Sequence, residues 1–459
     1  MGFQDHWGNA ITGAEETTAA AVSDFTEGLI KFDKKAGRVV GAAKKDPGSA
    51  IANAYAAMLM MFLEMQNSPQ VASKFLANAE AAAGGATDRE KRTVSIARRW
   101  VERDIPGVVA EGKELLDLYP SDLTMVKIRQ TMQFDWGDAA GMLHSARYGV
   151  SAFPNEAGAL GMLAFGQEES HQMREAEATS WRAIELDRTE GWAQHALAHV
   201  MLTEGRCDEG RGFMTSMTDT WEGKNSVLYC HNWWHLALFA ISQGDNAAAL
   251  AIYDDHIFGH QPDYSQDQIN EISLLARIEL AGLDVGDRWS GLADRLAPRN
   301  ADFVTPFLTM QYLYALARAG RAEAGLLLEN LRDVAGGDHW SADIWRDMAT
   351  PACEGMAAHA RGDWAAAADA LGRALPLIWK GGGSHAQRDL FHQIHLDAVI
   401  RAGRYAEAQQ ILMERLSFEP ESVPNNLALA RVYEELSLPI EASAARAKAG
   451  VPRCKNGSS

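Results

Sequence analysis

Two pairs of histidines in the middle of the chain are the residues best suited to chemistry. His195 and His199 lie four residues apart, and so do His231 and His235. On a helix this spacing places two imidazoles on one face. Imidazoles bind zinc, nickel or iron, and they also donate and accept protons in catalysis. The sequence therefore predicts a site that binds or transforms a ligand, with these four histidines as candidate metal ligands. The alternatives are histidines that act in a site without metal, and structural histidines that only hydrogen-bond or stack.

Cys230 directly precedes His231 and Asn232. A thiolate activated by an imidazole is a nucleophile, and a cysteine at a helix N-terminus has a lowered pKa. The alternative is a cysteine that only packs in the core, because catalytic partners meet in space and need not be neighbours in sequence. The sequence leaves both interpretations open.

Two further residues near the pairs could take part in a site. Asp254 could orient an imidazole by accepting the hydrogen bond of its second ring nitrogen, and His256 falls either beside it or in the core. Trp234 is expected to form a groove wall on which an aromatic or cationic ligand stacks.

The helices that position these residues follow from an internal repeat. Pro120, Pro154 and Arg188 mark equivalent turns 34 residues apart, which is the tetratricopeptide period. A glycine recurs in the turn between paired helices, usually with alanine five residues later, where a small side chain lets antiparallel helices approach closely. The turn glycines are Gly205, Gly244, Gly320, Gly362 and Gly403, and the alanines are Ala249, Ala367 and Ala408.

This repeat predicts an all-α, tetratricopeptide-like α-solenoid of about ten to eleven helical hairpins. No sheet is expected, because hardly any stretch alternates apolar and polar residues with β-branched enrichment. The predicted division is an N-terminal extension over residues 1–14, a superhelix over 15–450 and a disordered polar tail over 451–459.

The repeat register places three of the four histidines towards the concave groove of the solenoid. His195 and His199 occupy groove-facing positions of one first helix, and His231 does so in the next, with His235 near the groove edge. Because adjacent helices pack about 8–10 Å apart, imidazoles from both can converge on one point.

A second candidate region begins a later helix. Gly381 to Gly383 followed by Ser384 predict a flexible lead into an N-cap, with helix amides free to hold an anion. His392 and His395 further along this helix are spaced like a ligand pair, but their register faces the core between helices. The candidate substrate contacts at the helix start are Gln387, Arg388 and Asp389.

Composition excludes several classes of partner. The chain of 459 residues is 47% apolar and carries a formal charge of −18, which argues against nucleic acid or an anionic membrane as a partner. No segment has the pattern of a signal peptide or a membrane helix, so a cytoplasmic location is expected, and a homo-oligomer is compatible with the sequence. Four cysteines without a CxxC pair fit reduced thiols.

Taken together, these residues resemble the tetratricopeptide repeat protein 38 family. The matching stretches are Trp192 to His199, Cys230 to Leu238, Ala251 to Ile257 and Gly382 to Asp389, and the resemblance covers nearly the whole chain. It implies that the residues shared with the family pattern are His195, His199, Cys230, His231, Asn232, His235, Asp254, His256, Ser384, Gln387, Arg388 and Asp389. No histidine of that pattern matches His385, His392 or His395. The family implies a repeat fold and brings no reaction with it.

Two functions of different classes are predicted. The preferred one is a hydrolase-type enzyme that acts on a small molecule in the hollow of the solenoid, either with a divalent metal such as zinc or with Cys230 and a histidine. The alternative is a scaffold whose groove binds a peptide or protein, although peptide-carboxylate clamps of that class rely on Lys, Asn and Arg. The catalytic candidates are His195, His199, Cys230, His231, His235 and Asp254, and the substrate-binding candidates are Trp234, Gln387, Arg388 and Asp389.

Overall fold

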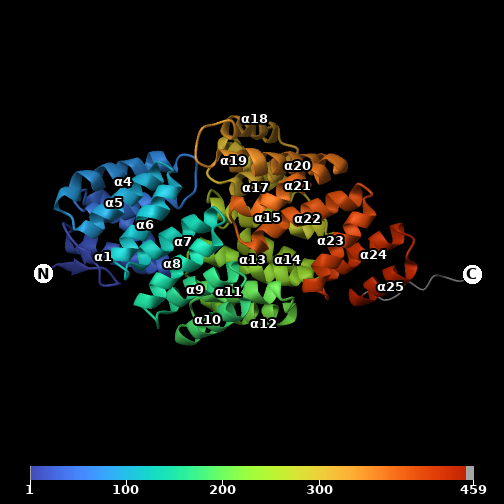
Figure 1. Ribbon diagram of the computed structural model, residues 1–459, viewed down its shortest axis with the longest axis horizontal. Coiled ribbons are helices and arrows are strands. Elements are labelled where there is room, and N and C mark those ends of the chain that lie inside the picture. The colour runs from blue at the N-terminus through green and yellow to red at the C-terminus, as the bar shows by residue number, and fades with distance from the viewer. Residues whose placement is uncertain (1, 451–459) are drawn as a thin grey trace, which may run out of the picture. The chain divides into compact units, whose positions relative to one another are not determined.

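A computed structural model describes residues 2–450, and helices follow one another through nearly all of that range (Figure 1). Consecutive helices are joined by short turns into antiparallel hairpins. This confirms the predicted all-α, tetratricopeptide-like solenoid. The predicted tail 451–459 lies outside the described residues.

The chain divides into two compact units, and each is described by itself. Unit 1 comprises residues up to 197 together with 219–229, and unit 2 comprises 198–218 together with the residues from 230 onward. The division passes through two continuous helices, α11 (Gly191–Thr203) and α13 (Ser226–Ser242).

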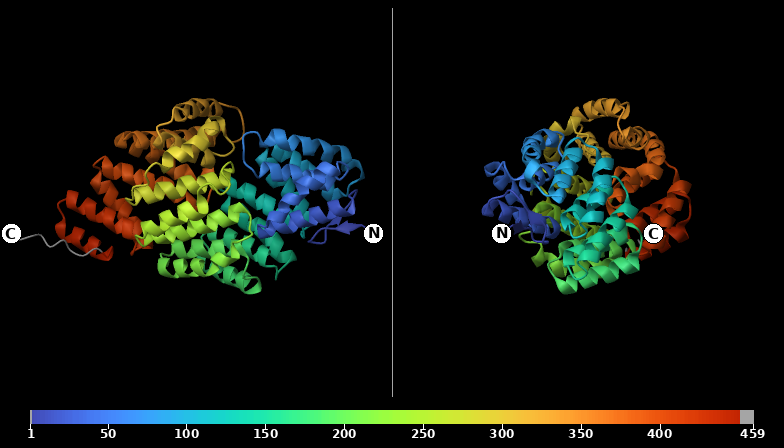
Figure 2. Two further views of the ribbon diagram at one scale, coloured as in Figure 1. Left: turned by 180° about the vertical axis from the view of Figure 1, so that it is seen from behind. Right: turned by 60° about the vertical axis from the view of Figure 1, so that its left-hand side comes forward.

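Unit 1 is a row of helical hairpins around one apolar core, drawn in blue to green in Figures 1 and 2. Helices α7, α9 and α11 begin at Leu123, Ala157 and Gly191, which confirms the 34-residue period. The helices of this unit are α1 (Glu16–Lys31), α2 (Arg38–Lys45), α3 (Ala50–Met61), α4 (Ser68–Ala82), α5 (Asp88–Val101), α6 (Ile105–Leu118), α7 (Leu123–Asp135), α8 (Ala139–Ala152), α9 (Ala157–Glu169) and α10 (Met173–Leu186).

The N-terminal residues depart from the expectation that no strand forms. Strands β1 (Phe3–Gln4) and β2 (Ala10–Ile11) pair in antiparallel fashion. The Asp5 carboxylate accepts hydrogen bonds from the backbone N–H groups of Trp7 and Asn9, at 3.0 and 2.9 Å. These bonds close the turn that joins β1 to β2. Such side-chain bonding to a local backbone is a turn signal that strand periodicity does not reveal.

Unit 2 contains the remaining hairpins, which pack around separate clusters of buried apolar side chains. Helix α15 packs against both α17 and α22, so segments more than 100 residues apart in sequence lie side by side. The helices of this unit are α12 (Cys207–Met217), α14 (Asn246–Ile252), α15 (Ser265–Leu280), α16 (Arg288–Leu296), α17 (Pro306–Arg318), α18 (Glu323–Ala335), α19 (Ala342–Ile344), α20 (Thr350–Arg361), α21 (Trp364–Ala374), α22 (His385–Arg401), α23 (Tyr405–Phe418), α24 (Val423–Glu435) and α25 (Pro439–Lys448).

The turn glycines take the conformation that the repeat requires. All five have φ between 67° and 80°, in the left-handed region that glycine enters at no steric cost. The alanines that follow three of them are fully buried between helices. Both observations confirm the predicted hairpin turns; the residues are Gly205, Gly244, Gly320, Gly362 and Gly403, with Ala249, Ala367 and Ala408.

Candidate functional site

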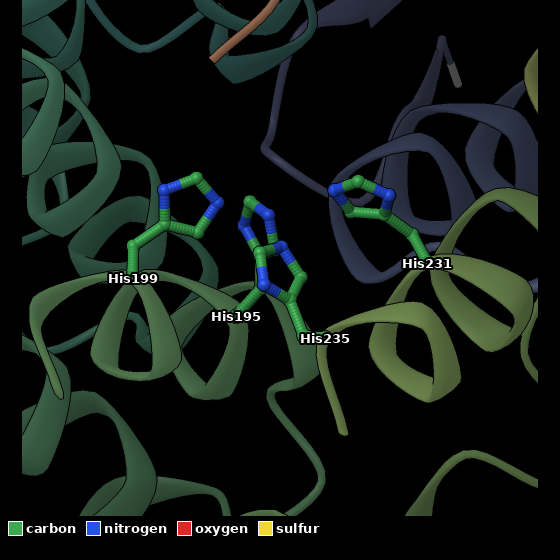
Figure 3. Close-up of side chains that lie close together, drawn as sticks. All are labelled: His195, His199, His231 and His235. Carbon is green, nitrogen blue, oxygen red and sulfur yellow. The ribbon is translucent and has the colours of Figure 1, made fainter. Parts of the chain in front are cut away.

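Three of the predicted histidines come together in unit 2. His199 lies on α11, and His231 and His235 lie one turn apart on α13. Each of the three places one ring nitrogen within 4.8 Å of a nitrogen of the other two. Figure 3 shows these side chains together with His195, which precedes His199 by one turn on α11 and belongs to unit 1.

The imidazole rings lie close together, tilted or edge-to-face, and are shielded from solvent. The ring centroid of His235 lies 4.5 Å from that of His199 and 4.8 Å from that of His231. His199 and His235 are fully buried, and His231 is 8% exposed. We name His199, His231 and His235 the histidine cluster.

Helix α15 supplies the polar partner of the cluster. The Oδ1 atom of Asn270 lies 3.0 Å from Nδ1 of His231. Because a carbonyl oxygen accepts, this hydrogen bond assigns the proton of His231 to Nδ1 and leaves the lone pair on Nε2. The second ring nitrogen is therefore the one that can coordinate a metal.

Burial keeps His231 and His235 uncharged at neutral pH. It lowers the pKa of His231 to about 4, although the hydrogen bond that His231 donates to Asn270 raises it in part. Burial also lowers the pKa of His235 well below its usual value, and positive charge on a protonated His199 or His231, or on Arg277, lowers it further. Neutral imidazole is the form that binds a metal ion.

An arginine and a tryptophan line the cluster, and the tryptophan differs from the prediction. Trp234 was expected to form an open groove wall, but it is fully buried and stacks on His231, with ring centroids 5.2 Å apart. The guanidinium of Arg277 lies 5.1 Å from the Trp234 ring and donates to the carbonyl oxygen of Ala386 at 2.7 Å. A stacked, buried ring fills space beside the imidazoles and offers no exposed stacking face.

His385 also lies close to the histidine cluster, and the sequence pattern did not predict this. Its ring centroid lies 5.4 Å from that of His199, and its Nε2 lies 3.0 Å from Oγ1 of Thr203. The resemblance gave no histidine at this position, and contacts between helices distant in sequence bring it there, since α22 packs against α15 and His385 itself contacts α11. The sequence signal was its place directly after the N-cap Ser384.

The surroundings of Cys230 oppose thiolate formation. The thiol is fully buried, and its Sγ lies 3.5 Å from Oδ2 of Asp267. Burial raises the pKa of Cys230, and the negative charge of Asp267 raises it further. The expected lowering by a helix N-terminus is wrong, because α13 begins at Ser226, a full turn earlier. The structure thus gives no support to a nucleophilic Cys230.

Asp254 and His256 have partners outside the cluster. The Asp254 carboxylate is exposed and forms a two-bond ion pair with Arg288, at 2.7 and 2.9 Å. The ring of His256 stacks on Trp233, with ring centroids 3.6 Å apart. The predicted orienting role of Asp254 is therefore replaced by a surface contact between helical segments.

The side chains at the start of α22, which were predicted to bind substrate, bond to the helix N-terminus and to neighbouring residues of the chain. Ser384 and Gln387 form a reciprocal capping box, so the first amides are already partly satisfied. Arg388 donates to the carbonyl oxygen of Gly383, and Asp389 forms a double ion pair with Arg415 at 2.6 and 3.0 Å. Burial alone would raise the pKa of Asp389, but Arg415 lowers it below the usual range.

His392 and His395 lie apart from the cluster. They line an open hollow of about 550 Å³ between α21, α22 and α23, together with Arg373, Arg404 and Glu407. His395 is buried, as its register predicts, whereas His392 is exposed at the rim.

No family model matches the sequence. Among solved structures, the chain is similar to the APC/C hetero-tetramer Cut9–Hcn1, at 13% identity over 94% of this chain and 68% of that chain, with a TM-score of 0.43. It is also similar to the human IFIT1 dimer with PPP-AAAA, at 11% identity over 87% and 90%, with a TM-score of 0.40. It is similar as well to the TPR domain of P58(IPK), at 13% identity over 79% of this chain and 92% of that chain, with a TM-score of 0.22. The tetratricopeptide-like fold of this chain is therefore assigned from its own helical repeat and turn glycines.

Proposed function

We propose that the histidine cluster binds a divalent transition metal such as zinc, and that the bound metal supports hydrolysis of a small molecule. The observation that carries the proposal is the approach of three buried imidazoles, one nitrogen of each lying within 4.8 Å of the other two. The lowered pKa values of His231 and His235 favour their neutral forms, whose lone pairs bind metal.

Three histidines are the ligand set of catalytic zinc sites that keep a fourth position for water. Zinc lowers the pKa of such a water to about 7, which supplies hydroxide at neutral pH. His385 is a further nitrogen donor near His199 and could hold a proton beside the metal.

The positive charge of Arg277 repels a metal cation bound nearby. The effect on metal binding therefore depends on how much of this charge is offset by other groups. Burial lowers the pKa of Arg277 to about 10, which still leaves it charged at neutral pH. Its charge is offset by the carbonyl oxygens of Ala386 and Gln387, at 2.7 and 3.2 Å, and by the carboxylate of Asp389. The guanidinium is thus held by the backbone of α22 and by Ser273.

Metal stoichiometry tests the proposal directly. Full-length protein is stripped with a chelator, dialysed against zinc and measured by elemental analysis. We expect one zinc per chain, which is lost when His235 is replaced by Ala. The matched control is His144→Ala, since His144 is an exposed histidine on α8. Equal zinc in both variants would overturn the proposal.

A scaffold function is the second candidate, and the helical-hairpin array favours it. Repeat arrays of this kind present extended surfaces on which a peptide can lie. The resemblance to the tetratricopeptide repeat protein 38 family is compatible with either function. Capture of a defined peptide from a synthetic library by the metal-free protein, unaffected by His235→Ala, would support the scaffold instead.

A further inference from the structure

A basic surface lies in unit 1, away from the proposed metal site, on a chain that is otherwise strongly acidic. Residues 31–45 contain six basic side chains and one acidic side chain, whereas the whole chain has a formal charge of −18. This segment runs from the end of α1 through the short 3-10 helix η1 (Lys34–Gly37) into α2.

The exposed residues of η1 and α2 lie on one helical face. Ala36, Val39 and Ala43 on the opposite face are buried against the neighbouring helices α1 and α3. From its first to its last residue the exposed face extends about 16 Å, the length of about five residues of extended chain. We name it the basic face, and it consists of Lys34, Gly37, Arg38, Gly41, Lys44 and Lys45.

Most of the positive charge on the basic face is not neutralised by the protein. Within residues 2–450, Lys34, Lys44 and Lys45 take part in no ion pair. Arg38 pairs with Asp24 at 2.9 Å, yet its side chain remains 68% exposed. Four cations are therefore available to carboxylates from outside the chain.

Helix stability accounts for only part of this charge. Lys44 and Lys45 occupy the last turn of α2, where the helix dipole favours a cation. Lys34 and Arg38 stand at the N-terminal ends of η1 and α2, where the dipole disfavours one. The position of these two cations thus has no explanation in the stability of the helices.

The middle of the basic face has no side chains. A Cβ at Gly37 or Gly41 would meet nothing within 4 Å, and neither residue has a positive φ, so the fold requires glycine at neither position. Glycine weakens a helix relative to alanine. What the two glycines provide is room for another backbone to approach the helix closely between the cations.

We propose that the basic face binds an acidic, extended peptide segment of a partner protein, whose carboxylates pair with the four cations and whose backbone lies over the two glycines. RNA or an anionic bilayer would extend beyond the face and meet the negative charge of the rest of the chain. Among residues 31–45 no large apolar side chain is exposed on which a base could stack or which could enter a bilayer.

The proposal is tested with full-length protein and a dye-labelled peptide of six glutamates, by fluorescence anisotropy at about 50 mM salt. We expect saturable binding that a peptide of six glutamines does not show. The double variant Lys44→Glu plus Lys45→Glu should weaken it at least about tenfold. The matched control is Lys74→Glu plus Lys91→Glu, which changes the net charge equally at two exposed lysines outside the face and should have little effect.

Gly41→Ala tests the backbone contact separately from charge. It keeps every cation and improves helix propensity, so the variant should fold, and we expect it to weaken binding of the glutamate peptide at least about threefold. Unchanged affinity would contradict the close approach.

Three other outcomes would overturn the proposal. One is the absence of binding by the glutamate peptide, and another is an equal loss in the control variant, which would reduce the effect to net charge. The third is tighter binding of a uridine hexanucleotide, of phosphatidylserine vesicles or of a second copy of the chain, lost in the Lys44 and Lys45 variant, since this would assign the basic face to that partner.

Discussion

At the scale of single residues, His231 of the histidine cluster makes the free energy of unfolding depend on pH. His231 has a folded-state pKa of about 4, below the value of about 6.5 of an unfolded histidine. Between pH 6.5 and pH 4 the unfolded chain binds a proton at this histidine and the folded chain does not. The free energy of unfolding therefore falls as the pH falls.

In metal-free protein we therefore expect the contribution of His231 to the free energy of unfolding to be fully present above pH 6.5. Below pH 6.5 this contribution should fall by up to about 1.4 kcal/mol per pH unit. Urea unfolding at pH 7, 6 and 5 measures this slope. His231→Gln should reduce it, and an unchanged slope would show that His231 is not buried in its neutral form.

Cys230 gives a second prediction at this scale. Its burial and the charge of Asp267 raise the pKa of the thiol, so iodoacetamide should modify it no faster than the buried Cys353. Cys207, which is partly exposed, should react first. Site-resolved mass spectrometry measures the three rates, and a Cys230 that reacts fastest would revive the nucleophile hypothesis.

At the scale of elements, the local part of the fold was predictable and the site was predictable only in part. The turn glycines and the 34-residue period depend on residues close in sequence, and both were found. The four histidines were recognisable from helical spacing. Arg277, Asn270 and His385 were not, because α15 and α22 bring them to the cluster through contacts that sequence spacing does not encode.

Helix α12 offers a prediction with a control in the same helix. A Cβ at Gly210 would lie 2.3 Å from Cζ of Phe239, a fully buried ring on α13, whereas a Cβ at Gly212 would meet nothing within 4 Å. Gly210→Ala should destabilise the protein by about 1–3 kcal/mol, and Gly212→Ala should stabilise it by up to about 1 kcal/mol. Chemical unfolding measures both, and equal effects would contradict the close packing of α12 on α13.

At the scale of the whole molecule, charge and composition limit the partners. None of the helices between residues 2 and 450 is both long enough and apolar enough to cross a bilayer. The formal charge of −18 repels phosphate backbones. Fluorescence anisotropy at about 150 mM salt should therefore show no binding of single-stranded RNA. Salt-dependent binding would mean that a local basic surface dominates the net charge.

The measurement that tests the central claim most directly is a double-mutant cycle on zinc affinity with His199→Ala and His231→Ala. If both imidazoles ligate one ion, either single variant should lose most of the affinity, and the double variant should be little worse than either. Small losses that add, or zinc binding that survives the double variant, would contradict a shared metal site and leave the cluster as a structural feature of the helical repeat.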